Sequence, residues 1–309
     1  MGDSASGQRS EKLKIMHDLT DIVDLQIKFN QSKNLFHKEF NETLKFTELT
    51  MAAIQNIDRI APDDLNVLID YTTEKVLQEF CRVNQYYSFQ ENDKTNLKKI
   101  YWNLYQNITE KKKTVEVISR THYENLKVWL AKTNPFSQEM YQKKETVLEP
   151  IMCAEYSAIL QKSILHLKDI QLLEPILDIG CGQDGNLVKY LRENAFECYG
   201  IDRFAQKSLF LEKVDWLNFD YGIEKWGTIF SNLGFSNHFI HNHLRKDGNF
   251  IEYAKKYMDI LKSLKIGGCF CYAPDIPFIE QYLDENIYSI KKYDIESFSF
   301  KTTIIKRLN

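Results

Sequence analysis

Glycine is scarce in this chain, and it is unevenly distributed. The sequence holds 12 glycines, and none lies between Gln8 and Ile179. At the average frequency of about 7 %, that stretch would hold about a dozen. Without glycine a segment cannot make the tight left-handed turns on which all-β domains depend, so the first half is not an all-β domain. The composition therefore predicts a change of architecture near residue 175.

Long apolar runs, a signal-like start and paired cysteines are also missing. No apolar run approaches the roughly 18 residues of a membrane span, and the first ten residues have neither the basic nor the apolar region of a secretory signal. The six cysteines form no C-x-x-C pair, which is typical of reduced thiols. We therefore expect a cytoplasmic protein without a membrane segment.

Neither sign of charge is in large excess. Forty basic residues stand against 43 acidic residues, which gives a net charge of −3. This balance argues against a general nucleic-acid binder, and the run Lys111-Lys112-Lys113 is interpreted as a solvated face. Hydrophobic residues make up 43 % of the chain and aromatic residues 13 %, so the chain can bury a substantial core and is not intrinsically disordered.

Apolar residues recur at helical steps of three and four throughout the first half. Three long helical regions are predicted, over residues 11–60 with a break at 30–34, over 62–89, and over 93–133. We therefore predict an all-helical domain over residues 11–134, preceded by a disordered N-terminus over residues 1–10. Two arrangements stay open, a helix bundle and a helical arm that pairs with a second copy of the chain as a homodimer.

Short apolar strands and helices alternate in the second half, which we take as one α/β domain over residues 135–309. A bridge over residues 136–173 is assigned to this domain. Strands are predicted at 176–179, 198–201, 228–230 and 269–273, with a helix over 250–264 and a closing hairpin over 287–306.

A glycine-rich turn follows the first of these strands. Gly180 and Gly182 allow backbone N–H groups to approach a ligand where a Cβ would collide, and the following helix start adds partial positive charge. Asp178, before the turn, is placed to bind a ligand ammonium group. The next strand ends in Asp202, about 20 residues after Gly182, where nucleotide-binding folds hold the ribose diol. This arrangement predicts a nucleotide-type ligand.

Four motifs follow one another in this half, in the order L-D-I-G-C-G-x-x-G, Y-G-I-D, W-G-T-I-F-S-N-L and L-K-I-G-G-C-F. Over about residues 150–309 they resemble the class I S-adenosylmethionine-dependent methyltransferases. The resemblance implies an α/β fold with a Rossmann-like seven-stranded methyltransferase sheet, here preceded by the all-α helical domain.

The same resemblance implies S-adenosyl-L-methionine as the cofactor. The Asp178 position and the glycine turn would contact its methionine part, Asp202 its ribose, and Asp215 with Trp216 its adenine; a core role for Trp216 stays open. The implied cofactor-binding residues are Asp178, Gly180, Cys181, Gly182, Asp202, Arg203, Asp215, Trp216 and Asn232.

Three of the chain's seven histidines stand close together, at positions 238, 241 and 243. With an ordinary pKa near 6.5, histidine can accept a proton from an acceptor hydroxyl or amine at neutral pH. His238 and His241 are therefore the candidate catalytic residues. Two other interpretations stay open, in which the histidines cap a helix or line a loop, or hold a metal; no metal is included in the predicted site.

We expect a methyltransferase that acts on a small-molecule or peptide acceptor. The segment Asn232-Leu233-Gly234-Phe235 lacks the two prolines that amino-methylating nucleic-acid enzymes of this family carry, which argues against a nucleic-acid partner. Three alternatives are kept: a nucleic-acid methyltransferase, transfer of the aminocarboxypropyl group of the same cofactor, and a non-catalytic interaction protein with this fold.

Overall fold

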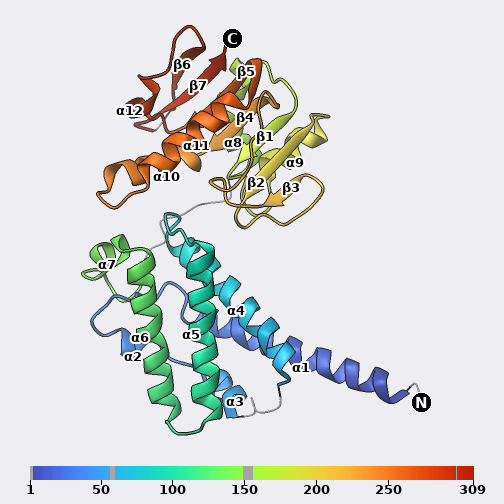
Figure 1. Cartoon of the computed structure of the whole chain (residues 1–309), viewed down its shortest axis with the longest axis vertical. Coiled ribbons are helices and arrows are strands. Elements are labelled where there is room, and N and C mark those ends of the chain that lie inside the picture. The colour runs from blue at the N-terminus through green and yellow to red at the C-terminus, as the bar shows by residue number, and fades with distance from the viewer. Residues whose placement is uncertain (1–2, 56–59, 149–155, 297) are drawn as a thin grey trace. The chain divides into compact units, whose positions relative to one another are not determined.

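The computed structural model describes residues 3–55, 60–148, 156–296 and 298–309. The chain divides into two units, unit 1 over Met1–Cys153 and unit 2 over Ala154–Asn309 (Figure 1). Every helix in these ranges is too short or too polar to pass through a bilayer.

Helices build the described part of unit 1, and the predicted break after the first of them is confirmed, because residues 30–39 form turns. The long helices α5 and α6 run alongside each other (Figure 1). The helices are α1 (Asp3–Phe29), α2 (Phe40–Thr43), α3 (Glu48–Gln55), α4 (Pro62–Val83), α5 (Glu91–Thr109), α6 (Val115–Thr133) and α7 (Phe136–Tyr141).

The region predicted as one helical stretch over residues 93–133 is two helices with a turn between them. Lys111 adopts a left-handed φ of 55°, which a helix cannot continue through. The hydroxyl of Thr114 then accepts a hydrogen bond from the N–H of Val117 and caps α6. The predicted solvated lysine run is exposed, but it lies in this turn.

The described helices of unit 1 extend beyond both predicted limits of the helical domain. Helix α1 begins at Asp3, within the segment predicted to be disordered over residues 1–10; this segment contains good helix formers, and Met1 and Gly2 lie outside the described residues. The boundary expected after residue 134 lies beyond α7, because Asn34 donates its side-chain N–H groups to the carbonyls of Tyr141 and Glu145 over 2.9 Å each. The first part of the bridge therefore belongs to unit 1.

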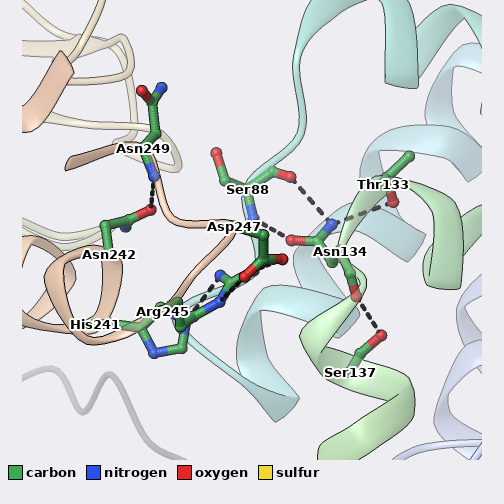
Figure 2. A network of polar contacts seen from close by, with 9 residues as sticks. All are labelled: Ser88, Thr133, Asn134, Ser137, His241, Asn242, Arg245, Asp247 and Asn249. Carbon is green, nitrogen blue, oxygen red and sulfur yellow. Dashed lines mark hydrogen bonds and ion pairs between the residues drawn. The ribbon is translucent and has the colours of Figure 1, made fainter. Parts of the chain in front are cut away.

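Asn134 ends α6 and starts α7 by hydrogen bonding, as Figure 2 shows. Its side-chain amide exchanges two hydrogen bonds with the backbone of Ser88, each over 3.1 Å. Its carbonyl accepts a hydrogen bond from the hydroxyl of Ser137 over 2.6 Å. A single buried asparagine thus fixes the chain direction where the sequence predicted the domain to end.

Unit 2 holds the predicted seven-stranded sheet, in the order β3-β2-β1-β4-β5-β7-β6 (Figure 1). Strands β1 to β5 pair in parallel, and β7 is antiparallel to both β5 and β6. The strands are β1 (Ile176–Ile179), β2 (Cys198–Asp202), β3 (Leu211–Lys213), β4 (Trp226–Asn232), β5 (Leu264–Ala273), β6 (Tyr288–Asp294) and β7 (Lys301–Arg307).

Two apolar clusters cover the two faces of this sheet, because successive strand residues point to opposite sides. Leu177 packs with residues of α10 and α11, whereas its neighbour Ile176 packs with residues of α9. This double covering buries β1 and β4 completely, and the loops after their carboxyl ends are where open α/β sheets bind a ligand. The described helices of unit 2 are α8 (Ala158–Ile164), α9 (Asn186–Glu193), α10 (Phe235–Leu244), α11 (Phe250–Lys262) and α12 (Pro277–Glu280).

Candidate functional site

Asp178 lies near the carboxyl end of β1, and its carboxylate is buried without a hydrogen-bond partner. The residue is 1 % exposed, and neither Oδ1 nor Oδ2 has a partner among the described residues. Burial, and after it the negative charge of Asp202, raises the pKa of Asp178 to about 7. A buried carboxylate without partners is costly, so a cationic ligand group placed beside it would be stabilised.

The first N–H groups of the glycine turn form hydrogen bonds within unit 2. Gly180 and Cys181 both donate to the carbonyl of Ile201, over 2.8 and 3.2 Å, and Gly182 donates to Oδ2 of Asp202 over 3.3 Å. These three N–H groups are thus bonded to β2, and the predicted role of Gly180 and Gly182 beside a ligand stays a prediction. A ligand pyrophosphate, which needs such N–H groups, finds these three already bonded.

Cys181 directs its side chain into the core rather than toward a ligand. A Cβ on Gly200 would lie 2.8 Å from Sγ of Cys181, and the thiol packs in the apolar cluster with Val188. Burial raises the pKa of this thiol. The side chain and the N–H of Cys181 thus both have contacts within unit 2, and its predicted contact with a cofactor stays a prediction.

Trp216 forms a wall beside the glycine turn. A Cβ on Gly180, whose φ is +78°, would lie 3.1 Å from Cζ3 of Trp216, so the indole ring and the backbone conformation together require glycine there. Trp216 also packs against the core, and its ring stands edge-on to His238 with centroids 4.8 Å apart. The core role and the site role that the sequence left open are therefore compatible.

Asp202 and Asp215 each hold the loop that follows them through Oδ1 of the carboxylate. Oδ1 of Asp202 accepts a hydrogen bond from the N–H of Phe204 over 2.8 Å, and Oδ1 of Asp215 accepts one from Leu217 over 2.9 Å. Burial raises the pKa of Asp202, against the opposing positive charge of Arg203. Both carboxylates are fixed in direction and keep further acceptor capacity for ligand hydroxyl or amine groups.

The end of β4 adds two further buried polar atoms without partners. Oδ1 of Asn232 and Oγ of Ser236 form no hydrogen bond within the described chain. Ser231 ties this end to β1, because its hydroxyl donates to the carbonyl of Ile179 over 3.0 Å and accepts from the N–H of Phe235 over 3.0 Å. Sequence reasoning missed Ser236, since nothing in its immediate pattern distinguishes it from other serines.

The three clustered histidines lie on α10, where each has different surroundings. His238 is buried and meets Trp216, whereas the exposed His243 stacks on Phe278 with ring centroids 3.9 Å apart. No group of three or more histidine, cysteine or acidic side chains that could hold a metal occurs in the ranges that the structure describes. The three histidine rings of α10 therefore pack against different neighbours.

His241 contacts the guanidinium group of Arg245, as Figure 2 shows. A guanidinium N–H of Arg245 lies 3.1 Å from Nε2 of His241, and Arg245 also pairs with Asp247 over 2.5 Å. Burial first, and then the charge of Arg245, lowers the pKa of His241 to about 4. Burial, Arg203 and His241 hold the pKa of His238 well below its usual range. Both rings are therefore neutral at pH 7 and weak as general bases.

We expect His241 to titrate near pH 4 in the folded protein. The change that tests the cause is Arg245→Gln, which removes the neighbouring charge and should move the titration of His241 upward toward its ordinary value. The measurement is an NMR titration of histidine ring protons in a sample with carbon-13-labelled histidine. A midpoint near 6.5 for His241 in the unaltered chain would contradict the arrangement described for α10.

No protein-family model matches the chain, and no curated protein matches its sequence. Solved structures do match. A TehB-like SAM-dependent methyltransferase from Corynebacterium glutamicum is 16 % identical, with 48 % of this chain and 87 % of that chain covered and a TM-score of 0.35. The N-methyltransferase NodS from Bradyrhizobium japonicum is 13 % identical, with 57 % and 98 % covered and a TM-score of 0.32.

A third similar structure, the PH0226 protein from Pyrococcus horikoshii, is 14 % identical, with 49 % of this chain and 89 % of that chain covered and a TM-score of 0.35. The strand order and register of unit 2 identify the architecture independently: five parallel strands reverse their order at β1 and β4, and an antiparallel β7 is inserted between β5 and β6. Unit 2 thus has the seven-stranded Rossmann-like sheet that the sequence resemblance to the class I S-adenosylmethionine-dependent methyltransferases implies.

Proposed function

We propose that unit 2 binds S-adenosyl-L-methionine and transfers its methyl group to a small-molecule or peptide acceptor. The observation that carries the proposal is the buried carboxylate of Asp178, which has no partner among the described residues and lies near the end of a central parallel strand. A ligand ammonium group at this point would restore the lost solvation and favour the ionised carboxylate.

The charges around the turn favour a cationic ligand over a dinucleotide. Burial and then the charge of Asp202 raise the pKa of Asp178, and burial raises the pKa of Asp202. The first N–H groups of the turn are bonded within unit 2. A pyrophosphate would add negative charge beside two carboxylates, whereas an amino acid ammonium and a sulfonium would add positive charge.

Each of four described side chains, or pairs of side chains, would bind a different part of this cofactor. Asp178 would hold the ammonium group, Asp202 the ribose hydroxyls, and Asp215 with Trp216 the adenine. The unpaired amide oxygen of Asn232 would face the reacting end of the ligand. When bound, the cofactor supplies an electrophilic methyl group.

The α10 histidines fit positioning better than proton removal, because both are held neutral at pH 7. His238 packs against Trp216 and would orient the wall of the site, while His241 is held by Arg245. An acceptor that reacts without losing its proton first, such as a neutral amine or a thiolate formed in solution, agrees with this arrangement.

Calorimetric titration of the full chain with S-adenosylhomocysteine, with NAD⁺ as the comparison, tests the proposal. We expect saturable binding of S-adenosylhomocysteine at one site per chain and none of NAD⁺. Tighter binding of NAD⁺ would contradict the cofactor assignment. Once an acceptor is found, a product mass gain of about 14 Da indicates methyl transfer, whereas about 101 Da would indicate aminocarboxypropyl transfer and overturn the proposed reaction.

A further inference from the structure

Unit 1 contains an apolar cavity that the proposed function does not use. Its volume is about 250 Å³, and its walls come from α1, α4, α5, α6 and the turns after α1. Most of the lining side chains are aliphatic or aromatic, among them Ile22, Leu68, Ile69 and Leu126. Protein interiors leave few voids larger than one water molecule. A space of this size between helices is therefore a candidate ligand site.

The size of the cavity sets the size of the molecule that would fill it. An engineered apolar cavity of about 150 Å³ in another protein holds benzene. By the same measure, this cavity accommodates a chain of about ten carbon atoms. An apolar chain of that length would cover the exposed carbon surface of the walls and release the water there.

A cation lies in the lining of this otherwise apolar space. The ammonium group of Lys33 donates to Oδ1 of Asn30 over 3.1 Å and to the carbonyl of Thr43 over 2.8 Å. Because an ammonium group has three donors, one N–H is left by these two bonds. The ammonium nitrogen of Lys33 also lies 3.8 Å from the ring centroid of Phe29, and no carboxylate stands within ion-pair distance of it in the described ranges.

The surroundings of Lys33 favour an anion rather than a neutral group. Burial, and after it the charge of Lys45, lowers the pKa of Lys33. The nearest lining acid, Glu79, is already paired with Arg82 over 2.7 Å. The positive charge of Lys45 thus acts on Lys33, and a ligand anion at Lys33 would offset this repulsion.

The wall also carries a hydrogen-bonding atom that no protein group satisfies. Nδ1 of His122 is buried without a partner among the described residues, and His122 lines the cavity between Tyr101 and Tyr123. Leaving such an atom buried and unpaired is unfavourable, because it has lost its hydrogen bond to water. This second polar point indicates a ligand or ordered water inside the cavity.

We propose that this cavity binds an amphiphile whose apolar chain fills the space between the helices and whose carboxylate pairs with Lys33. The proposal concerns unit 1 alone and does not depend on the cofactor assigned to unit 2. The ligand class is a carboxylic acid with a chain of about ten carbons.

Calorimetric titration of the full chain with decanoate tests this site. 1-Decanol is the uncharged control of equal chain length, and butyrate is the charged control with a short chain. We expect decanoate to saturate one site per chain below about 1 mM, and butyrate not to bind in that range. Lys33→Met keeps the apolar stem and removes the charge, so it should weaken decanoate binding about tenfold, the loss expected for a charge-assisted hydrogen bond, and leave decanol binding unchanged.

Two further variants separate the effect of the Lys33 charge from the effect of cavity volume and from loss of folding. Lys28→Met makes the same charge change at an exposed lysine of α1 that does not line the cavity, and should bind decanoate like the unaltered chain. Val76→Phe places a larger ring into the cavity and should weaken both decanoate and decanol, with a thermal melt to show that it is folded. Absence of saturable decanoate binding would overturn the proposal, as would equal losses for decanoate and decanol in Lys33→Met.

Discussion

Replacing Asp178 with asparagine is expected to stabilise the ligand-free protein, by up to about 4 kcal/mol above pH 7. The folded protein raises the pKa of Asp178 from 3.8 to about 7, and one unit of pKa corresponds to about 1.4 kcal/mol. Between these two values the folded chain keeps a proton that the unfolded chain has lost. The free energy of unfolding of the unaltered chain therefore falls as pH rises through this window, and the asparagine variant is spared that loss.

Urea unfolding at pH 4 and at pH 8 measures this effect. The stability difference between Asp178→Asn and the unaltered chain should be small at pH 4 and largest at pH 8. Glu193→Gln removes the same charge from an exposed position of α9 and serves as the matched control, with no comparable gain expected. A difference for Asp178→Asn that stays constant between the two pH values would show that its carboxylate is not desolvated.

Gly227→Ala is expected to destabilise unit 2 by about 3 kcal/mol or more. Gly227 lies in the central strand β4, where an added Cβ would stand 2.4 Å from the carbonyl oxygen of Leu173 and 2.8 Å from that of Glu174. Both atoms belong to the backbone, so the strand or the preceding segment must move. Faster hydrogen exchange in peptides of β1, β4 and β5, with the helices of unit 1 unchanged, is the expected readout.

Gly267→Ala, in β5, provides the matched control for Gly227→Ala. The same methyl group is added, but nothing lies within 4 Å of the Cβ position at Gly267, whose φ is +81°. The cost there is limited to the left-handed backbone, about 1 kcal/mol. Equal protection losses in the two variants would contradict the close packing of Gly227 against the segment before β1.

The elements around the candidate site were predictable because their signals are local. A buried strand, a glycine turn and a helix follow one another directly around Asp178, and the β-branched alternation before Arg307 predicted the antiparallel pair β6 and β7. The resemblance then supplied the single seven-stranded sheet, which local patterns do not contain. The hydrogen bonds of the glycine turn could not be predicted in this way, since they depend on the carbonyl of Ile201, a partner distant in the chain.

The side-chain directions and the domain boundary could not be read from local pattern. Cys181 stands in a glycine turn, and its position gives no sign that Gly200 leaves room for its thiol in the core. The segment after Asn134 contains apolar residues that suit either unit; its place in unit 1 depends on the buried amide of Asn34, which lies about a hundred residues earlier. Likewise, the low pKa of His241 depends on Arg245 and on burial, whereas its position alone predicted an ordinary histidine.

The affinity of S-adenosylhomocysteine as a function of pH tests most directly the claim that Asp178 holds a ligand cation. In the unaltered chain the dissociation constant should fall about tenfold between pH 6 and pH 8, because binding requires the ionised carboxylate and its pKa in the free protein is about 7. Asp178→Asn should bind at least tenfold more weakly at pH 8, without this pH dependence. If Asp178→Asn binds as tightly as the unaltered chain at pH 8, the central claim is contradicted.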